Sequence, residues 1–317
     1  MIKILILLII ILIMGYLSKK KNFNGGKRSK KECFNSNISE SLIKKCNKIL
    51  INKEKDCQCE DENNNASNNY KECISKNNNQ NCKKYNSCKN IFGSFLSGYE
   101  PNLNLNLWKS PYIKGTHNCY TYFLDDRIDS LKEECHKKCL SKQKKDKKDG
   151  KRVISCPPNA NNRIEKCGEL KPQPGDYAYE VGNLNSRNSI YTCKEMEKKI
   201  MRDNLDNDNK YIIEKVNSLS EKCPSTKYKG AMVVDPGDNP NKGHTFHFYR
   251  QDKNMLFSHK PGILDVETYD ASRYPIYAPH LADRNYNKKR KKNGINYKTF
   301  CGYYCIPHND YGRTNAI

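Results

Sequence analysis

The hydrophobic pattern divides the chain into an apolar start, a polar stretch and a long patterned segment. Residues 4–14 form an unbroken apolar run. Residues 33–88 carry few large apolar side chains and are interrupted by runs of asparagine. From Trp108 onward, aromatic and aliphatic residues recur at the spacings of helices and strands. This pattern predicts a main folded domain over residues 105–317.

The first element predicted in this domain is a helix over residues 124–140. Apolar residues recur there at intervals of four, three and four: Leu124, Ile128, Leu131 and Cys135. That spacing places them on one face of an α-helix. We expect this helix to begin a few residues earlier, at Cys119.

The second half of the domain has the alternation of β-strands. Strands are predicted at residues 231–234, 245–250 and 255–259. Asp252–Asn254 supplies the hairpin turn between the last two, and a further strand is expected after the turn Pro174–Asp176. A helix followed by a largely antiparallel sheet belongs to the α+β class.

The apolar start predicts a targeting segment over residues 1–18. Residues 4–17 would span about 21 Å as a helix, less than the roughly 30 Å of a bilayer core. This length favours a secretory signal peptide. An uncleaved signal anchor is the open alternative, because no small-residue cleavage site follows and residues 19–32 form a basic linker.

The cysteine content indicates an oxidising compartment, since the 317 residues include 16 cysteines. Together with the leader, it predicts a secreted or membrane-anchored protein. Seven of the cysteines lie in residues 33–90, where disulfide bonds would replace a missing core in a small module. Zinc is the competing interpretation, but this module has no Cys-x-x-Cys pair and no histidine.

The chain is strongly basic, with 57 lysine and arginine residues against 35 acidic residues. Its mean hydropathy of −0.94 excludes a polytopic membrane protein. Two basic loops without apolar residues are predicted at 142–152 and 287–293. They are either solvated or attract an anionic partner, such as a cell-wall-type polymer or a membrane surface. We do not expect nucleic acid, because aromatic stacking residues are not interleaved with these charges.

Cys119 differs from the other cysteines by its expected position at the start of a helix. Unpaired backbone N–H groups and the helix dipole favour a thiolate there, and a thiolate is a nucleophile. The alternative is that Cys119 forms a disulfide bond. Without Cys119 the main domain keeps eight cysteines, enough for four bridges: Cys135, Cys139, Cys156, Cys167, Cys193, Cys223, Cys301 and Cys305.

Two pairs among these eight cysteines invite separate predictions. Cys135 and Cys139 are one helical turn apart and are expected to bridge to separate partners. Cys301 and Cys305 are expected to anchor the C-terminus through disulfide bonds. With His308, they could instead serve as metal ligands.

His247 and His259 are the candidate proton carriers. They lie twelve residues apart on consecutive predicted strands, so a hairpin can place them side by side. One imidazole would then act as the base and the other would orient it. The alternatives are structural histidines, a zinc site that includes His244, or orientation of the base by an acidic residue: Asp265, Asp270 or Asp283.

Four stretches occur in an order known from one family. They are Pro111–Gly115, Asn118–Tyr120, Gln173–Asp176 and the segment from His247 to His259. This order resembles the NlpC/P60 and CHAP group of papain-like cysteine peptidases and amidases. In that group a cysteine opens a helix, a Pro-Gly-Asp turn introduces the sheet, and a histidine is followed about a dozen residues later by a polar residue, often a second histidine. The resemblance covers residues 108–262.

The resemblance implies a papain-like α+β fold and thiol-dependent hydrolysis of an amide bond. Peptidoglycan-type crosslinks are the first substrate class that it implies. By the same resemblance Cys119 would be the nucleophile, His247 the base and His259 its orienting partner. The Tyr112 hydroxyl would lie near the oxyanion site. This chemistry needs no metal and no cofactor.

Two features depart from the pattern of that group. The usual Asp-Cys-Ser is replaced by Asn118–Tyr120, and the interval from Asp176 to His247 is longer and rich in lysine and asparagine. The substrate side of the site would therefore differ. The alternative function is a non-catalytic, disulfide-stabilised surface or virion protein that uses the same fold for binding.

Overall fold

The computed structural model describes residues 38–57, 80–153, 156, 167, 171–176, 190–205, 208, 210, 212–238, 244–289 and 294–308. Residues Ser39–Ile317 form one compact unit. The predicted leader and linker (residues 1–32) and the strand expected after Asp176 lie outside the described residues.

Two helices near the start of this unit are joined by a disulfide bond. Helix α2 (Glu40–Cys57) and helix α4 (Gln80–Gly93) are linked through Cys46 and Cys88. This crosslink, between residues 42 positions apart, lowers the entropy of the unfolded chain. The expectation of disulfide bonding in the cysteine-rich module is therefore confirmed. Few large side chains of the two helices are buried: Ile43, Leu50, Tyr85 and Phe92.

An antiparallel sheet forms the centre of the main domain. Its strands are β1 (Glu214–Val216), β2 (Lys227–Asp235), β3 (Thr245–Gln251), β4 (Phe257–Ser258) and β5 (Thr299–Pro307). They lie in the order β1-β5-β2-β3-β4, and every neighbouring pair is antiparallel. The strands predicted at 231–234 and 245–250 are confirmed, whereas β4 is shorter than predicted and β1 and β5 were not predicted.

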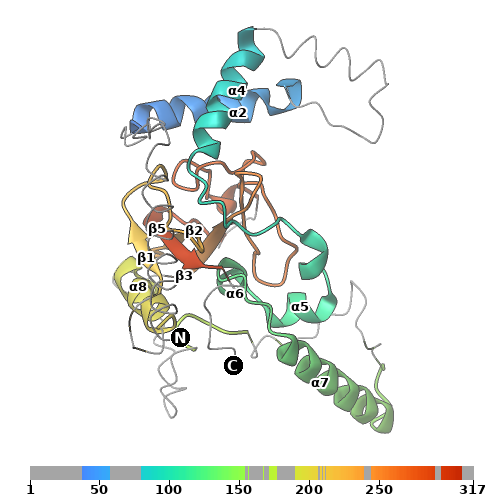
Figure 1. The fold of residues 1–317 in the computed structure, drawn as a ribbon. Helices are drawn as coiled ribbons and strands as arrows, with labels where there is room; N and C mark the ends of the chain where they lie inside the picture. The colour runs from blue at the N-terminus through green and yellow to red at the C-terminus, as the bar shows by residue number, and fades with distance from the viewer. Residues whose placement is uncertain are drawn as a thin grey trace, which may run out of the picture. The chain divides into compact units, whose positions relative to one another are not determined.

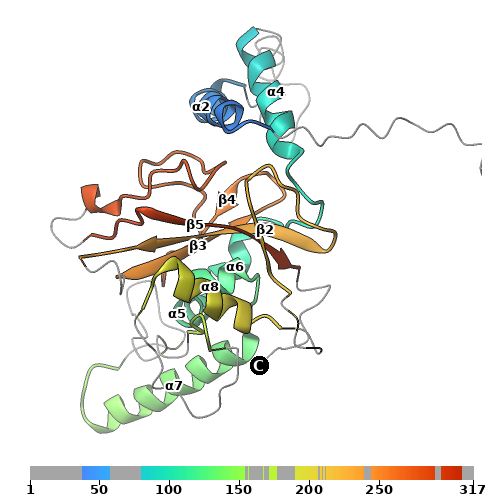
Figure 2. The same ribbon diagram turned by 90° about the vertical axis from the view of Figure 1, so that its left-hand side faces the viewer.

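Helices cover one face of this sheet. The helices of the main domain are η2 (Leu105–Trp108), α5 (Pro111–Thr116), α6 (Cys119–Phe123), α7 (Asp129–Lys148) and α8 (Cys193–Arg202), and η5 (Tyr286–Lys289) lies between β4 and β5. Helix α6 packs against β3, and α8 packs against β2 and β5 (Figure 1). Figure 2 shows α6 and α8 on one side of the sheet and the chain between β4 and β5 on the other. The α+β class is confirmed.

The helix-covered face of the sheet is apolar. Because alternate residues of a strand point to opposite faces, Phe246 and Phe248 face the helices while His247 and Tyr249 face the other way. The shared core includes these buried residues: Tyr120, Phe123, Leu124, Met196, Ile200, Met232, Val234, Phe248 and Ile306.

Helix α6 lies close to the sheet at Gly230. A Cβ atom at this position would lie 2.4 Å from the ring of Phe123 and 2.6 Å from the side chain of Ile306. Glycine is therefore required for this packing of α6 on β2. The contact sets the distance between the sheet and the helix that begins with Cys119.

The predicted helix over residues 124–140 is wrong at its start. Helix α6 ends at Phe123, and Leu124 is its buried C-terminal cap. Asp125 has a φ of 50°, a left-handed conformation that does not continue a helix. Helix α7 then begins at Asp129. Leu124 and Ile128 both pack on the core, but a turn joins them, and apolar spacing alone does not distinguish the two cases.

The basic loop predicted at residues 142–152 is also wrong for most of its length, because α7 continues to Lys148. Lysine is a favourable helix former. Lys138 and Glu134 form an ion pair at 3.4 Å, four residues apart on this helix. The charged composition therefore describes an exposed helix rather than a loop.

The disulfide bonds of the main domain use all eight cysteines other than Cys119. Those on α7 bridge to separate partners, as predicted, and those on β5 anchor the C-terminal strand. With the bond between α2 and α4, five disulfide bonds in the described part of the chain indicate an oxidising, extracellular environment. No helix in the described ranges is both long and apolar enough to cross a bilayer. The four bonds are Cys135–Cys167, Cys139–Cys156, Cys193–Cys301 and Cys223–Cys305.

Candidate functional site

Cys119 is the first residue of α6 and the one unpaired cysteine of the described residues. A capping box fixes this helix start. The Asn118 side chain accepts hydrogen bonds from the N–H groups of Tyr120 (2.9 Å) and Thr121 (3.1 Å). The Thr121 hydroxyl accepts one from the Asn118 N–H (3.0 Å), and the Asn118 amide donates to the carbonyl oxygen of Pro172 (2.8 Å). Because the sulfur of Cys119 is unpaired, the disulfide alternative for this residue is excluded.

The Cys119 side chain is buried, with 6% of its surface exposed. Burial raises the pKa of its thiol to about 12, and the backbone N–H of Phe248 and the charge of Lys260 oppose this shift. The expectation that the helix start favours a thiolate is wrong for the resting protein. Desolvation outweighs the N–H groups of a helix that is only five residues long. At neutral pH the sulfur is a protonated thiol.

His247 on β3 and His259 directly after β4 lie side by side, with Nε2 of His247 2.8 Å from Nδ1 of His259. Nε2 of His259 lies 3.1 Å from the carbonyl oxygen of Tyr269. A carbonyl oxygen only accepts, so Nε2 of His259 carries a proton and its Nδ1 accepts from Nε2–H of His247. Neutral His247 therefore has an unprotonated Nδ1, which can take up a proton. The predicted contact between the two histidines is confirmed.

Aromatic side chains enclose the two imidazoles. The Tyr297 ring stacks on His247 with 5.2 Å between ring centroids, and Tyr249 lies at 5.2 Å from both imidazoles. Burial lowers the pKa of His247 well below its ordinary value, and the like charge of His259 adds to this effect. Burial also lowers the pKa of His259 to about 4. Both rings are neutral at physiological pH.

The Cys119 side chain packs against one face of β3, whereas the side chain of His247, which belongs to β3, points to the other face. Cys119 packs in the apolar cluster that contains Phe248, whereas His247, one residue earlier, points to the other face of the strand. The sulfur meets the strand at the backbone N–H of Phe248. Within the described residues, no hydrogen bond joins the sulfur to either imidazole. The structure thus brings thiol and base to adjacent positions of one strand without direct contact.

Tyr112 lies on α5, and its hydroxyl is 2.5 Å from Nδ1 of His136 on α7. Its side chain packs beside the disulfide-bonded sulfurs of Cys135, Cys139 and Cys167. The structure therefore connects Tyr112 to α7. It does not bring the Tyr112 hydroxyl into a hydrogen bond with the thiol at the start of α6.

His117 is a buried histidine that holds the turn before α6. Its Nε2 accepts a hydrogen bond from the N–H of Ile128 (2.9 Å), so its Nδ1 donates to the Thr116 hydroxyl (2.8 Å). That hydroxyl donates in turn to the Tyr112 carbonyl oxygen (2.7 Å). Burial lowers the pKa of His117 to about 4, and its contacts are those of a structural residue.

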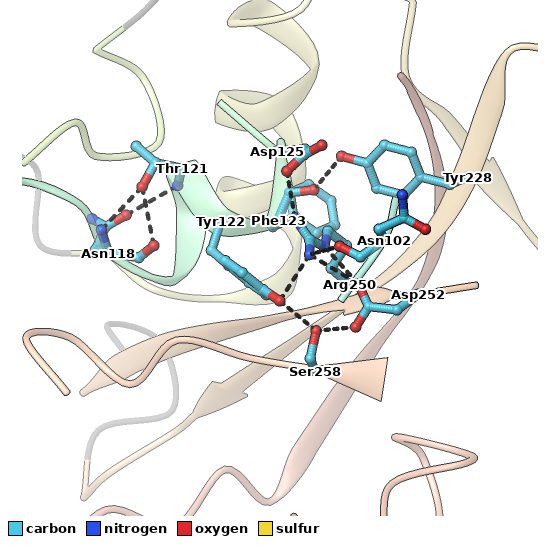
Figure 3. A network of polar contacts seen from close by, with 10 residues as sticks. All are labelled: Asn102, Asn118, Thr121, Tyr122, Phe123, Asp125, Tyr228, Arg250, Asp252 and Ser258. Atoms are coloured by element: carbon cyan, nitrogen blue, oxygen red, sulfur yellow. Dashed lines mark hydrogen bonds and ion pairs between the residues drawn. The ribbon is translucent and has the colours of Figure 1, made fainter. Parts of the chain in front are cut away.

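A network of buried polar groups lies at the turn end of the β3–β4 hairpin (Figure 3). Arg250 is 1% exposed and contacts the carboxylates of Asp125 (2.5 Å) and Asp252 (2.9 Å). It also donates to the Tyr122 hydroxyl (2.9 Å), which lies 2.6 Å from the Ser258 hydroxyl. Ser258 donates to Asp252. The network ties α6 to both strands of the hairpin.

Sequence reasoning missed this network. The signal that could have found it is an arginine and an aspartate two residues apart at the end of an otherwise uncharged strand, Arg250 and Asp252. Two such residues lie on one face of a strand, and a buried guanidinium requires a carboxylate partner. Asp125 and Tyr122 reach the same guanidinium from a segment more than a hundred residues away, which only the fold reveals.

The alternative metal sites do not form in the described part of the chain. Cys301 and Cys305 are disulfide-bonded, which excludes them as ligands beside His308. His244 contacts Asp235 at 3.3 Å, and no three His, Cys, Asp or Glu side chains converge among the described residues. The orienting contact of His247 comes from a histidine rather than an aspartate.

Comparison with known proteins gives a local similarity. A stretch of 54 residues is 43% identical to Insoluble matrix shell protein 1 of Ruditapes philippinarum. It covers 17% of this chain and 32% of that protein, so the match spans about a third of that relative's length. No family model and no solved structure matches the chain. The functional assignment therefore depends on the chemistry of the site.

Proposed function

We propose that the protein is a thiol-dependent hydrolase of amide or peptide bonds, with Cys119 as the nucleophile, His247 as the base and His259 as its orienting partner. The observation that carries the proposal is the hydrogen-bond chain from His247 through His259 to the carbonyl oxygen of Tyr269. This chain leaves Nδ1 of His247 as the basic atom. The thiol contacts the next residue of the same strand, Phe248.

Because the thiol and His247 make no direct contact in the resting protein, the proposed reaction requires substrate binding to bring Nδ1 of His247 within reach of the sulfur. The Cys119 thiol then gives its proton to Nδ1 of His247 while the sulfur attacks the substrate carbonyl carbon. The C–N bond then breaks, and His247 returns the proton to the leaving amine. Water cleaves the resulting thioester with His247 again as the base, which restores the thiol. Throughout, His259 accepts the Nε2–H of His247, holds its tautomer and stabilises the imidazolium.

The neutral resting state makes proton transfer part of the attack instead of an earlier step. Burial accounts for both the raised pKa of Cys119 and the lowered pKa of His247. Because the sulfur is nearly inaccessible, the reaction also requires the substrate to reach the start of α6. The Cys119 N–H is the proposed oxyanion donor, and Tyr112 would join it only by leaving its contact with His136.

The proposed substrates are peptides with cell-wall-type crosslinks, as the resemblance to the NlpC/P60 group implies, and the proposed architecture of the domain is papain-like. The packing of α6 on an antiparallel sheet supports this architecture. Five disulfide bonds support export. Anchoring by residues 1–18 and attraction of anionic polymers or membranes by the basic segments 142–152 and 287–293 belong to the same proposal.

The test is hydrolysis of crosslinked peptides of peptidoglycan type by the purified protein with its disulfide bonds intact. We expect the native protein to release amines and Cys119→Ala and His247→Ala to lose about 100-fold or more of this activity. His244→Ala is the matched control, because His244 begins the same strand region but is largely exposed. Equal cleavage by Cys119→Ala, or none by the native protein, would refute the proposal.

A second candidate function is that of a non-catalytic, disulfide-stabilised binding or matrix protein. Two observations favour it: the burial and raised pKa of the Cys119 thiol, and the local similarity to a shell matrix protein. Alkylation of the unreduced protein separates the two functions. The hydrolase requires a thiol that reacts in the folded state and reacts more slowly in His247→Ala. A thiol that reacts only after unfolding would favour the binding protein.

A further inference from the structure

Lys260, the residue after His259, is a fully buried lysine. Its Nζ donates to the backbone carbonyl oxygens of His117 (2.8 Å), Gly262 (2.5 Å) and Lys114 (3.4 Å). Three carbonyl acceptors match the three protons of an ammonium group, whereas a neutral amine has only two. The hydrogen bonding therefore favours the charged form of this side chain, whereas burial lowers its pKa from 10.5 to about 7.

This buried charge has no acidic partner in the described part of the chain. Asp265 favours the ammonium of Lys260 from a distance, but its ion pair is with Lys114, at 3.0 Å. Arg250, which is equally buried, contacts two carboxylates. A buried charge without a counter-charge is costly, so a second charge is expected to complete the environment of Lys260.

The Cys119 sulfur is the group that can supply that charge. Lys260 binds the carbonyl oxygen of His117, two residues before Cys119. The two side chains also interact electrostatically: the ammonium lowers the pKa of the thiol, and the thiolate raises the pKa of the lysine. Loss of the thiol proton would therefore create an anion that interacts with the Lys260 ammonium.

We infer that Lys260 is a positioning residue that stabilises the anionic form of Cys119. Its ammonium supplies the positive charge that the neutral imidazoles lack, and its hydrogen bonds hold the turn that begins α6. When the S–H bond of Cys119 breaks and the proton passes to Nδ1 of His247, the negative charge on sulfur faces Lys260. The catalytic consequence rests on the proposed hydrolase, whereas the effect on the thiol does not.

The experiment titrates the thiol in the full-length, unreduced protein. The ultraviolet absorbance of the thiolate, taken as the difference from a Cys119→Ser variant, gives the ionised fraction, and iodoacetamide gives its reactivity. In Lys260→Met we expect a higher thiol pKa and about tenfold slower alkylation below it. Lys260→Arg keeps the charge and should recover most of the rate. If Lys260→Met does not fold, Lys260→Gln provides the same comparison.

Three further groups bear on this titration and stay unchanged in all these variants. Lys171 interacts with the thiolate as a second cation, and the pKa of Tyr297 is raised chiefly by burial and also by the thiolate. His247 lies on the adjacent strand position. Because these groups are common to every variant, a difference between the profiles reports the charge at position 260.

Lys229→Met is the matched control. Lys229 is a buried lysine on β2 whose Nζ donates to the Leu219 carbonyl oxygen (2.5 Å). The acidic residues that interact with it are Glu100 and Glu221, and Cys119 is not among its partners. This variant should lose stability without changing the thiol profile.

The outcomes separate this inference from the proposed function. An unchanged thiol profile in Lys260→Met, or an equal shift in Lys229→Met, would overturn the role of Lys260. A shifted profile in a native protein that cleaves no peptide would keep the role of Lys260 and refute the hydrolase.

Discussion

The two ends of the β3–β4 hairpin are equally buried but differ in charge compensation. At the turn end, Arg250 lies between Asp125 and Asp252 and also donates to a tyrosine hydroxyl. At the open end, His247 and Lys260 have no carboxylate partner among the described residues. The imidazole is kept neutral, and the ammonium binds only backbone oxygens.

This difference shows that the charge partners of a buried group, and not its burial alone, decide whether the group stabilises the fold. A compensated network stabilises one arrangement of the chain, because each charge has its counter-charge in the folded state only. An uncompensated cluster contributes less to stability, but it can accept a proton or stabilise a new anion. The turn end is therefore a charge-compensated network that stabilises the fold, whereas the open end holds buried groups whose charge can change.

The largest expected effect comes from removing the guanidinium of Arg250 from the network at the turn end. Arg250→Met leaves the buried carboxylate of Asp252 and the partly exposed carboxylate of Asp125 without a counter-charge, and we expect the free energy of unfolding to fall by about 3–5 kcal/mol. Urea denaturation of the oxidised protein measures it. Arg273→Met, which removes an exposed ion pair with Glu267, should cost less than about 1 kcal/mol. Equal losses in both variants would contradict the comparison.

The second-largest expected effect is that acid lowers the free energy of unfolding of the protein through the histidines at the open end. The pKa of His259 is lowered from 6.5 to about 4, so between these pH values the unfolded chain binds a proton that the folded chain does not. The contribution of His259 to the free energy of unfolding is therefore fully present above about pH 6.5. It falls by about 3 kcal/mol as the pH approaches 4. The pKa of His247 is lowered as well, so its contribution has the same sign.

Denaturation midpoints measured across this pH range test the acid effect. The double variant His247→Gln/His259→Gln should lose most of the dependence, although His117, with its pKa lowered to about 4, retains its own share. If the double variant is as acid-sensitive as the native protein, the histidine pair is not the source.

A smaller effect is expected at the contact between α6 and the sheet. Helix α6 carries both Tyr122 of the Arg250 network and Cys119. In Gly230→Ala the new methyl group meets the ring of Phe123, and relief of this overlap should cost about 1–3 kcal/mol. Gly115→Ala is the control, because its Cβ would lie at an ordinary 3.7 Å from the nearest atom. Thermal unfolding of the two variants should differ clearly, and identical melting would show that α6 adjusts freely.

The smallest effect concerns single hydrogen bonds within the Arg250 network at the turn end. Tyr122→Phe and Ser258→Ala should each destabilise the protein by about 1 kcal/mol. Because the two hydroxyls lie 2.6 Å apart, their effects should not add, and a double-mutant cycle should give a coupling of at least about 0.5 kcal/mol. Strict additivity would mean that the network does not act as a unit.

Prediction from sequence succeeded where short-range rules apply. Alternation predicted β2 and β3, and the hairpin spacing predicted the contact between His247 and His259. The number of cysteines in the main domain allowed four bridges without Cys119, and four form. Prediction failed at the helix start, because the turn at Asp125 depends on contacts with the core and with Arg250. It also missed β5, whose partner β2 lies about seventy residues earlier in the sequence.

The amino-acid sequence by itself determined the strand periodicity, the oxidising environment and the identity of the residues with reactive side chains, because these depend on composition and local spacing. Only the tertiary structure decided how those residues are charged. Burial keeps the Cys119 thiol protonated and both imidazoles neutral, and among the described residues Lys260 has no acidic partner. Desolvation depends on every atom packed around a group, and those atoms come from segments that are far apart in the sequence.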